Sequence, residues 1–392
     1  MRIAIDARMM GPLVTRGIGR YVEELTRAMI AQAPHHQFVL LMRNPETSSF
    51  LGQPNVEHIV ADVPWYGWRE QIEMPKFFRE ARADLVHVPH WNAPLFYRGT
   101  YVLTIHDILL RRQPFSSKIS TRHPAYAFLK YYAYRALIHH NISHARHILV
   151  PTQFVADELQ GFYRVPSSRI TITSEGLTDF PAPYFSILDR YFLLPTSYFL
   201  YVGSAYPHKR LDLLLDAWQV IAAYHPELSL IIAGEEDVFM ARHVAFVKQQ
   251  NLSRVTFTGR VTDAELAALL QNASAFVFPS SHEGFGLPPL EALSFGTPVI
   301  SSDSTCLPEV LPKEGVFFFR NGDVNDMIRA VDTLLGSSSQ ARAAAGRAQA
   351  IVKMRYRWSE VAARTLETYE RIHFSSHAKN PASFPSKEIH QT

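Results

Sequence analysis

The chain has 392 residues, of which 47% are hydrophobic and 12% aromatic; this suits a globular protein of two domains and excludes a disordered or fibrous one. Basic and acidic residues number 39 and 36 and leave a formal charge of +3, too near balance for a general nucleic-acid binder. The single cysteine, Cys306, excludes a disulfide framework and a cysteine-based zinc site. We therefore expect a cytoplasmic protein without a nucleic-acid partner.

Short apolar runs alternate with longer helical patterns along the whole chain, which is typical of βαβ units with parallel sheets. The strands predicted in the first half are Arg2–Ile5, Phe38–Met42, Val56–Val60, Leu85–His87, Tyr101–Ile105, His147–Val150 and Ile170–Thr173. Those predicted in the second half are Phe199–Val202, Leu228–Ala233, Val255–Phe257, Ala275–Phe278, Pro298–Ser301 and Val316–Phe319. Helical patterns include Tyr21–Ala33, Leu211–Tyr224 and Ala264–Gln271. The pattern predicts an α/β protein with two lobes, joined by a proline-containing hinge at Asp179–Ser197.

A membrane span is not expected, because no run of about 18 apolar residues occurs. The stretch between Asp107 and Asp157 nevertheless contains basic and aromatic residues and no acidic ones. This composition favours a peripheral contact with an anionic membrane surface, or a phosphorylated substrate. The alternative interpretation is a solvated helix whose aromatic residues belong to the core.

The segment Ser280–Leu293 carries the most informative pattern. It follows the predicted strand Ala275–Phe278 and opens a helix, so it lies at the carboxyl end of a strand, where open α/β sheets bind ligands. Gly284 and Gly286 permit a close backbone approach, and the free amides at a helix start favour an anion such as a diphosphate. The alternative is that Glu283 is a helix-start acid and Glu291 a surface residue.

Four further segments follow predicted strands. In Gly203–Arg210, Lys209 and Arg210 place two cations at a helix start, which calls for a compensating anion unless both side chains are simply exposed. Gly17 and Gly19 form a glycine pair too incomplete for a dinucleotide fingerprint, so they indicate only a tight turn or a close phosphate approach. Pro89–Asn92 and Thr104–Asp107 end neighbouring strands and are expected to line one crevice.

Together these segments resemble the retaining glycosyltransferases of family 4, which have two Rossmann-like lobes facing each other across an interdomain cleft, the GT-B architecture. The most specific likeness is Glu283–Ala292, which is similar to the family's Glu-x7-Glu motif. Ile5–Arg8, Gly17–Tyr21 and Thr104–Asp107 look like first-lobe signatures of mannosyltransferases. The resemblance covers about Met1 to Glu370 and implies transfer of a hexose, above all mannose from GDP-mannose, to a saccharide or lipid-linked saccharide.

The resemblance also implies roles for individual residues. Glu283 at the donor sugar and His106 at the transferred sugar or acceptor are the catalytic candidates, and Trp91 and Asp107 are candidates for acceptor binding. The donor-binding candidates are Gly17, Gly19, Gly203, Ser204, Lys209, Arg210, Arg260, Val261, Gly284, Phe285, Gly286, Leu287 and Glu291. No metal or cofactor is expected, because a helix start and basic side chains would balance the diphosphate charge.

The same likeness divides the chain into an acceptor-side domain at 1–180, a donor-side domain at 181–357, a helix returning to the first lobe at 358–373 and a disordered tail at 374–392. Two positions depart from the family pattern. Ser204 stands where many members have an arginine, and Glu175 stands where they often have asparagine. Other donors such as UDP-glucose, UDP-N-acetylhexosamine or dTDP-rhamnose, an epimerase or phosphorylase activity, and a non-catalytic sugar-nucleotide-binding partner are the remaining alternatives.

Overall fold

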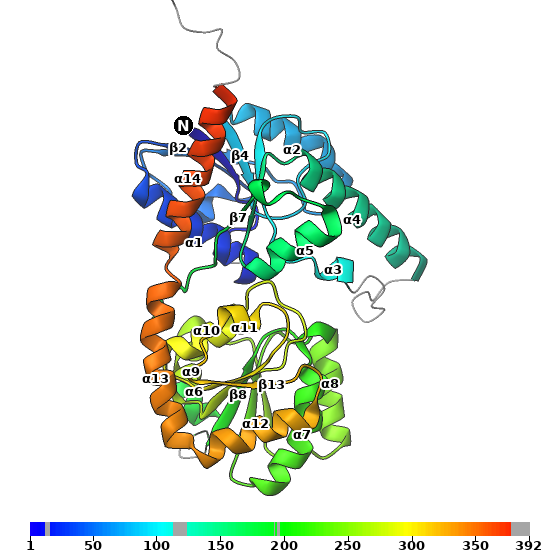
Figure 1. Cartoon of the computed structure of the whole chain (residues 1–392), viewed down its shortest axis with the longest axis vertical. Coiled ribbons are helices and arrows are strands. Elements are labelled where there is room, and N and C mark those ends of the chain that lie inside the picture. Colours follow the sequence, from blue (N-terminus) through cyan, green and yellow to red (C-terminus); the bar gives the residue numbers. More distant parts are fainter. Residues whose placement is uncertain (12–15, 113–123, 192, 194–196, 378–392) are drawn as a thin grey trace, which may run out of the picture.

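The computed structural model describes residues 1–11, 16–112, 124–191, 193 and 197–377, and it consists of two α/β lobes stacked along the long axis of the molecule (Figure 1). The first lobe is built on a seven-stranded sheet of order β3-β2-β1-β4-β5-β6-β7, with every pair parallel. Its strands are β1 (Arg2–Asp6), β2 (Gln37–Met42), β3 (Val56–Val60), β4 (Leu85–Val88), β5 (Tyr101–Thr104), β6 (His147–Val150) and β7 (Ile170–Ile172). Its helices are α1 (Arg16–Gln32), η1 (Pro45–Thr47), α2 (Trp68–Glu80), α3 (Leu109–Arg112), α4 (Pro124–His144), α5 (Gln153–Tyr163) and η2 (Ser167–Arg169).

The second lobe has a six-stranded parallel sheet of order β10-β9-β8-β11-β12-β13. Its strands are β8 (Tyr198–Val202), β9 (Ser229–Ala233), β10 (Val255–Gly259), β11 (Ala275–Phe278), β12 (Val299–Ser302) and β13 (Val316–Phe319). Its helices are α6 (Ser186–Arg190), η3 (Pro207–Lys209), α7 (Leu211–Tyr224), α8 (Val238–Gln249), α9 (Asp263–Asn272), α10 (Leu287–Ser294), α11 (Leu307–Val310), α12 (Val324–Gly336) and α13 (Ser338–Arg355). This confirms the prediction of two Rossmann-like lobes and every predicted strand.

The central strands of both sheets are buried on both faces. Successive residues of a strand point to opposite faces, so in β1 the side chains of Ile3 and Ile5 enter one core while Ala4 enters the other. In the second lobe Phe199 and Leu200 are divided in the same way. This double burial explains why the strands appear in the sequence as continuous apolar runs rather than as alternating ones.

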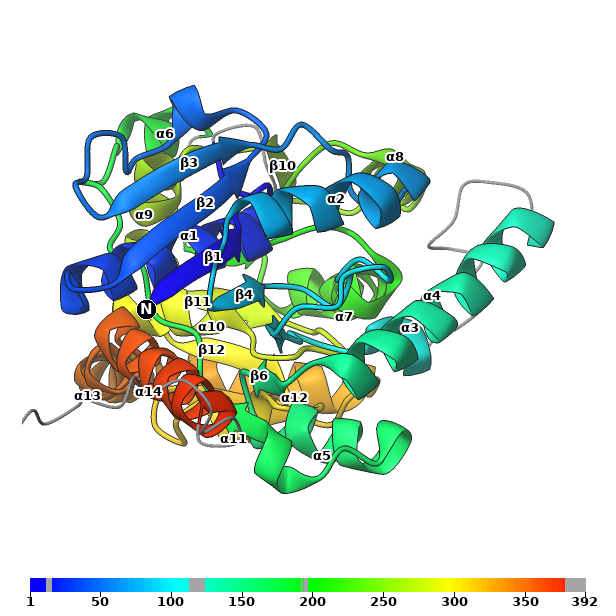
Figure 2. The ribbon, with the colours of Figure 1, turned by 90° about the horizontal axis from the view of Figure 1, so that it is seen from above.

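The last helix, α14 (Trp358–His377), leaves the second lobe and packs against α1 on the first (Figures 1 and 2). It runs past Glu370 to His377, so residues 374–377, which we predicted as part of a disordered tail, are helical; residues 378–392 lie outside the described part. One other prediction of local structure needs correction: helix α1 begins at Arg16 rather than Tyr21. The hinge segment contains the short helix α6.

The chain crosses between the lobes at two places that lie side by side. Where it leaves β7, the amide of Leu177 donates to the carbonyl of Tyr356, 2.8 Å away. The indole of Trp358 covers Gly176, and its Nε1 donates to Thr178 Oγ1 at 3.4 Å. The outgoing and returning segments are therefore fastened to each other. Among the described residues, no helix is long and apolar enough to cross a membrane.

A buried polar chain fastens α14 to the first sheet. The hydroxyl of Tyr369 lies 2.7 Å from His87 Nδ1, and His87 Nε2 lies 2.8 Å from Thr104 Oγ1. Burial, with a smaller contribution from the charge of His106, lowers the pKa of His87 to about 3, so the ring is neutral at pH 7. Tyr369 therefore satisfies a nitrogen that has no access to water.

We expect Tyr369→Phe to lower the free energy of unfolding by about 1–3 kcal/mol, because His87 Nδ1 loses its partner in a buried site. Denaturant unfolding followed by circular dichroism measures this change. Tyr224→Phe is the control, because Tyr224 is 78% exposed and loss of its hydroxyl leaves no buried group without a partner. Equal midpoints for the two variants would contradict the assigned role of Tyr369.

Candidate active site between the lobes

The segment between β11 and α10 forms the second lobe's side of the site. Gly286 has φ +93° and precedes the two prolines that open α10, a conformation that glycine adopts readily. The amide of Glu283 donates to Thr305 Oγ1 at 3.1 Å, and the amide of Ser281 donates to the carbonyl of His208 at 2.7 Å. The loop that carries Glu283 is thus fixed by the segments that follow β12 and β8.

Lys209 and Glu283 meet at the carboxyl ends of β8 and β11. These two strands are neighbours at the point where the strand order reverses, the usual ligand position in an open α/β sheet. Lys209 Nζ lies 2.6 Å from Glu283 Oε1 and 5.6 Å from the centre of the Phe278 ring. Both charged side chains are only 19% and 12% exposed, so their attraction is screened less than that of a surface pair.

His106 forms the first lobe's side of the site. Its Nδ1 lies 2.9 Å from Glu175 Oε1 and its Nε2 3.2 Å from the carbonyl oxygen of Pro89. Burial would lower the pKa of His106, but the hydrogen bond and negative charge of Glu175 outweigh it and raise the pKa. Because both nitrogens face acceptors, the ring is best satisfied when both carry a proton.

The two lobes touch through their backbones beside these side chains. A Cβ on Gly284 would lie 1.7 Å from the carbonyl oxygen of His106 and 3.2 Å from Asp107 Cβ, so this position admits only glycine. Thr152 Oγ1 in the first lobe donates to the carbonyl of Gly284 at 3.0 Å. The charges of Glu283 and Asp107 both act on His208, so the residues predicted from the two lobes converge at one place.

Arg20 makes a second bridge between the lobes. From α1 it reaches Asp263 in the second lobe, and its guanidinium lies 3.4 Å from Glu291 Oε1 on α10. Each glutamate of the predicted Glu-x7-Glu pattern is therefore held by a cation: Glu283 by Lys209 and Glu291 by Arg20.

An aromatic surface extends the site on the first lobe. Trp91 stacks on Tyr66 with ring centres 5.5 Å apart and meets Tyr134 edge-on at 4.8 Å. Tyr66 is 54% exposed. Its backbone amide donates to Glu70 Oε2 at 2.8 Å, and Glu70 in turn pairs with the buried Arg8 at 2.7 Å.

The remaining predicted site residues have different positions. Gly17 and Gly19 lie in the first turn of α1 rather than before it. Gly203 ends β8 with φ +153°, and the carbonyl of Ser204 accepts a hydrogen bond from Tyr201. Arg210 is directed to Asp212, its Nε lying 3.3 Å from Oδ1.

Four others lie on or beneath the surface of the second lobe. Arg260 follows β10 and is exposed, whereas the side chain of Val261 is buried in the core of this lobe. Phe285 also points into that core, with its ring against Tyr356, and Leu287 packs at its margin. The ring of Phe285 is therefore buried in the core of the second lobe.

Two histidines that the sequence did not single out flank the ion pair. Nδ1 of His208 and Nε2 of His282 are buried without a hydrogen-bond partner among the described residues. Burial, followed by the charge of Lys209, lowers the pKa of His208 to about 4, so it is neutral at pH 7. Each directly precedes a singled-out residue, Lys209 or Glu283, and that adjacency is the signal that could have found them.

Among the described residues, the side chains that could hold a metal ion form one group outside this site. His35, His36 and Glu370 lie together near the end of α1 that is opposite Arg20. No residue of this group belongs to the cleft.

Sequence comparison assigns both halves of the chain. Residues 15–178 match the family described as Glycosyltransferase Family 4, and residues 194–350 match Glycosyl transferases group 1. The two matches leave out little but the hinge and the terminal segments. The chain belongs to the GT-B glycosyltransferases of family 4.

Individual relatives of this family 4 chain agree with the assignment. The O-antigen chain mannosyltransferase B of Escherichia coli is 30% identical over 245 residues, which are 60% of this chain and 63% of that protein, less than two thirds of its length. Sucrose-phosphate synthase from Thermosynechococcus elongatus has a similar fold, with TM-score 0.76, 20% identity and coverage of 95% and 99% of the two chains. Anabaena HepE in complex with UDP and glucose has TM-score 0.70, 16% identity and coverage of 94% and 99%.

We expect Glu175→Gln to lower the pKa of His106, because the variant removes the negative charge and leaves the effect of burial. A pH titration of the histidine ring resonances by NMR measures this: the pKa of His106, raised above its ordinary value in the unmodified protein, should be lower in the variant. Glu360→Gln is the control, since Glu360 is an exposed partner of Arg357. An unchanged His106 titration in Glu175→Gln would show that the carboxylate does not govern the ring.

Proposed function

We propose that this chain is a retaining glycosyltransferase that moves a hexose from a nucleotide sugar to a saccharide acceptor. The observation that carries the proposal is the meeting of Lys209 and Glu283 at the reversal point of the second sheet, opposite His106 of the first lobe. This arrangement places a cation for a diphosphate beside a carboxylate for a sugar. The relatives named as mannosyltransferases support the reaction class.

The chemical need is to stabilise negative charge on the departing diphosphate. In the proposed complex Lys209 turns from Glu283 to the diphosphate, and the amides at the start of α10 add fixed dipoles in the same direction. Glu283, released from Lys209, then accepts hydrogen bonds from the hydroxyls of the donor sugar. Because Lys209 supplies the counter-charge, the proposed reaction uses no divalent metal and no cofactor.

His106 and the two orphaned histidines shape the space for the transferred sugar in this proposal. The hydrogen bond and charge of Glu175 raise the pKa of His106 and so favour its charged form, which in turn favours a partly negative oxygen beside the ring. His208 and His282 each keep one ring nitrogen without a partner, and a sugar hydroxyl can both donate to and accept from such a nitrogen. Glu291 would take the ribose hydroxyls once they replace Arg20.

For the donor we propose GDP-mannose. The support is the relative named as an O-antigen chain mannosyltransferase, whereas HepE, whose fold is similar, was seen with UDP and glucose. The acceptor would lie over the rings of Tyr66 and Trp91, because the apolar faces of sugars pack well on aromatic rings, and Asp107 lies beside them. A lipid-linked acceptor with a peripheral membrane contact fits the basic stretch after Asp107.

The direct test is a donor screen with the purified protein and a mannose-containing oligosaccharide as acceptor. GDP-mannose should give product, and UDP-glucose, UDP-N-acetylhexosamine and dTDP-rhamnose should give little. Turnover with one of the other donors would replace mannose in the proposal and keep the reaction class. Nucleotide-sugar binding by calorimetry without any transfer would instead favour the non-catalytic partner.

We expect Glu283→Ala to reduce kcat for transfer by about 1000-fold, because the interaction it loses is made at the reacting sugar. Initial rates with saturating donor measure this, and circular dichroism checks that the fold is retained. Glu314→Ala is the matched control, because Glu314 is an exposed partner of Arg347. Full turnover of the Glu283 variant would refute its role.

We expect Lys209→Met to weaken nucleotide-sugar binding and lower kcat, together by about 100-fold or more, because the diphosphate loses its principal cation. Lys248→Met, at the exposed end of α8, is the control. In the same assay EDTA should leave the unmodified enzyme fully active. A Lys209 variant with normal rates, or an enzyme silenced by EDTA and restored by Mg²⁺, would contradict the proposed charge balance.

A further inference from the structure

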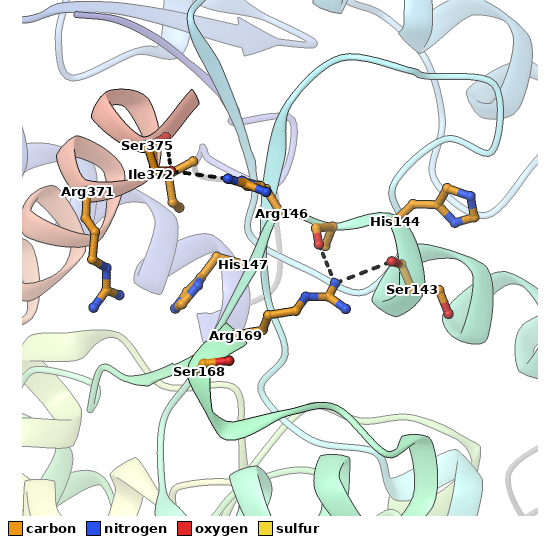
Figure 3. Close-up of a pocket in the computed structure, with 10 residues that line it drawn as sticks. Ser143, His144, Arg146, His147, Ser168, Arg169, Arg371, Ile372 and Ser375 are labelled. Carbon is orange, nitrogen blue, oxygen red and sulfur yellow. Dashed lines mark hydrogen bonds between the residues drawn. The ribbon is translucent and has the colours of Figure 1, made fainter. Parts of the chain in front are cut away.

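A cavity of about 500 Å³ lies in the first lobe, away from the residues described above. It is bounded by the end of α4, the start of β6, the short helix η2 that precedes β7 and the last turns of α14 (Figure 3). The side chains that give it its character are Arg146, Arg169, Arg371, His144, His147 and Ser375.

This cavity lies at the amino ends of the strands of the first sheet, whereas the cleft lies at their carboxyl ends. Strand β6 enters at His147 beside the cavity and ends at Val150, after which Thr152 contacts the second lobe at Gly284. Since β6 and β7 run parallel, the start of both strands faces away from the proposed donor site. A ligand here would therefore be distinct from the nucleotide sugar.

The lining carries positive charge and no carboxylate. Arg146 donates to the hydroxyl of Ser375 at 3.2 Å, and Arg371 donates to Thr171 Oγ1 at 3.2 Å. Both partners are neutral, and neither guanidinium has an acidic partner among the described residues. Arg169 differs, because it donates to the last carbonyls of α4, including that of Ile142 at 2.8 Å, where a helix end favours a cation.

His147 reports how strongly these charges converge. Its ring is buried and lies 2.8 Å from Thr171 Oγ1. Burial, followed by the charges of Arg371, Arg169 and Arg146, lowers its pKa to about 4. The ring is therefore neutral at pH 7. The three guanidinium groups repel one another, and because no acidic residue of the described part lines the cavity, a bound anion would reduce that repulsion.

We propose that this cavity binds a phosphate group, held between Arg146 and Arg371. Both side chains are exposed at the cavity mouth, and a guanidinium presents a planar pair of donors that matches phosphate oxygens. The volume exceeds that of inorganic phosphate and leaves room for the rest of a phosphorylated ligand. The phosphate is either that of a soluble ester or that of a lipid headgroup, and binding would join the end of α14 to β6.

The test titrates the protein with inorganic phosphate while the ring resonances of His147 are followed by NMR, so that the signal reports this cavity and not the cleft. The resonances should shift in a saturable manner, and the same titration of Arg146→Gln/Arg371→Gln should show at least about tenfold weaker binding. Lys209→Met should keep the response, since it alters only the cleft. Arg347→Gln is the control for loss of a surface arginine, since its own partner Glu314 is exposed.

Vesicles distinguish the two sources of phosphate. A lipid headgroup is identified if the protein sediments with phosphatidylglycerol vesicles but not with phosphatidylcholine vesicles, and if the double variant sediments less. Saturable binding of free phosphate without vesicle binding would identify a soluble ester. If His147 does not respond to phosphate and vesicles capture the double variant as well as the unmodified protein, the proposal is wrong; circular dichroism of the double variant excludes misfolding as the cause of any loss.

Discussion

The architecture of the cleft depends on the close approach of two peptide backbones, that of Gly284 in the second lobe and that of His106 in the first. A side chain at residue 284 cannot be accommodated there, and the hydrogen bond from Thr152 holds the contact from the other side. Everything chemical in the site is arranged around this point: Glu283 precedes it, α10 follows it, and His106 and Asp107 stand opposite. The backbone contact positions groups from the two lobes precisely, because the position of a backbone atom varies less than that of the end of a long side chain.

The charges of the site are balanced within the protein before any ligand arrives. Glu283 pairs with Lys209, Glu291 with Arg20 and His106 with Glu175. Partly buried ions without partners would be costly, so these pairs stabilise the site. A ligand that offers both a diphosphate and hydroxyl groups replaces both members of a pair at once, whereas a ligand that offers only one of them leaves an ion without its partner. For the proposed donor, this arrangement would favour a whole nucleotide sugar over its fragments.

The sequence was sufficient for the strands, because most of them are short apolar runs, and for the loops after β8 and β11, because glycine and charged residues follow those strands. It was insufficient where the partners are distant in the chain. Arg20 and Glu291 are 271 residues apart and His106 and Glu175 are 69 apart, and no local pattern connects them. The start of α1 was misplaced because Gly17 and Gly19 are poor helix formers, although the helix includes both.

The pair of chain crossings at Leu177 and Tyr356 determines how the lobes can move. The two chain segments that connect the lobes are hydrogen-bonded to each other at one edge of the molecule. They therefore act as a single pivot rather than as two independent connections. We expect any opening of the lobes to be a swing about that edge, with the largest travel at the far rim and the least near Trp358. The far rim would then give the widest mouth, while residues near the pivot keep their neighbours.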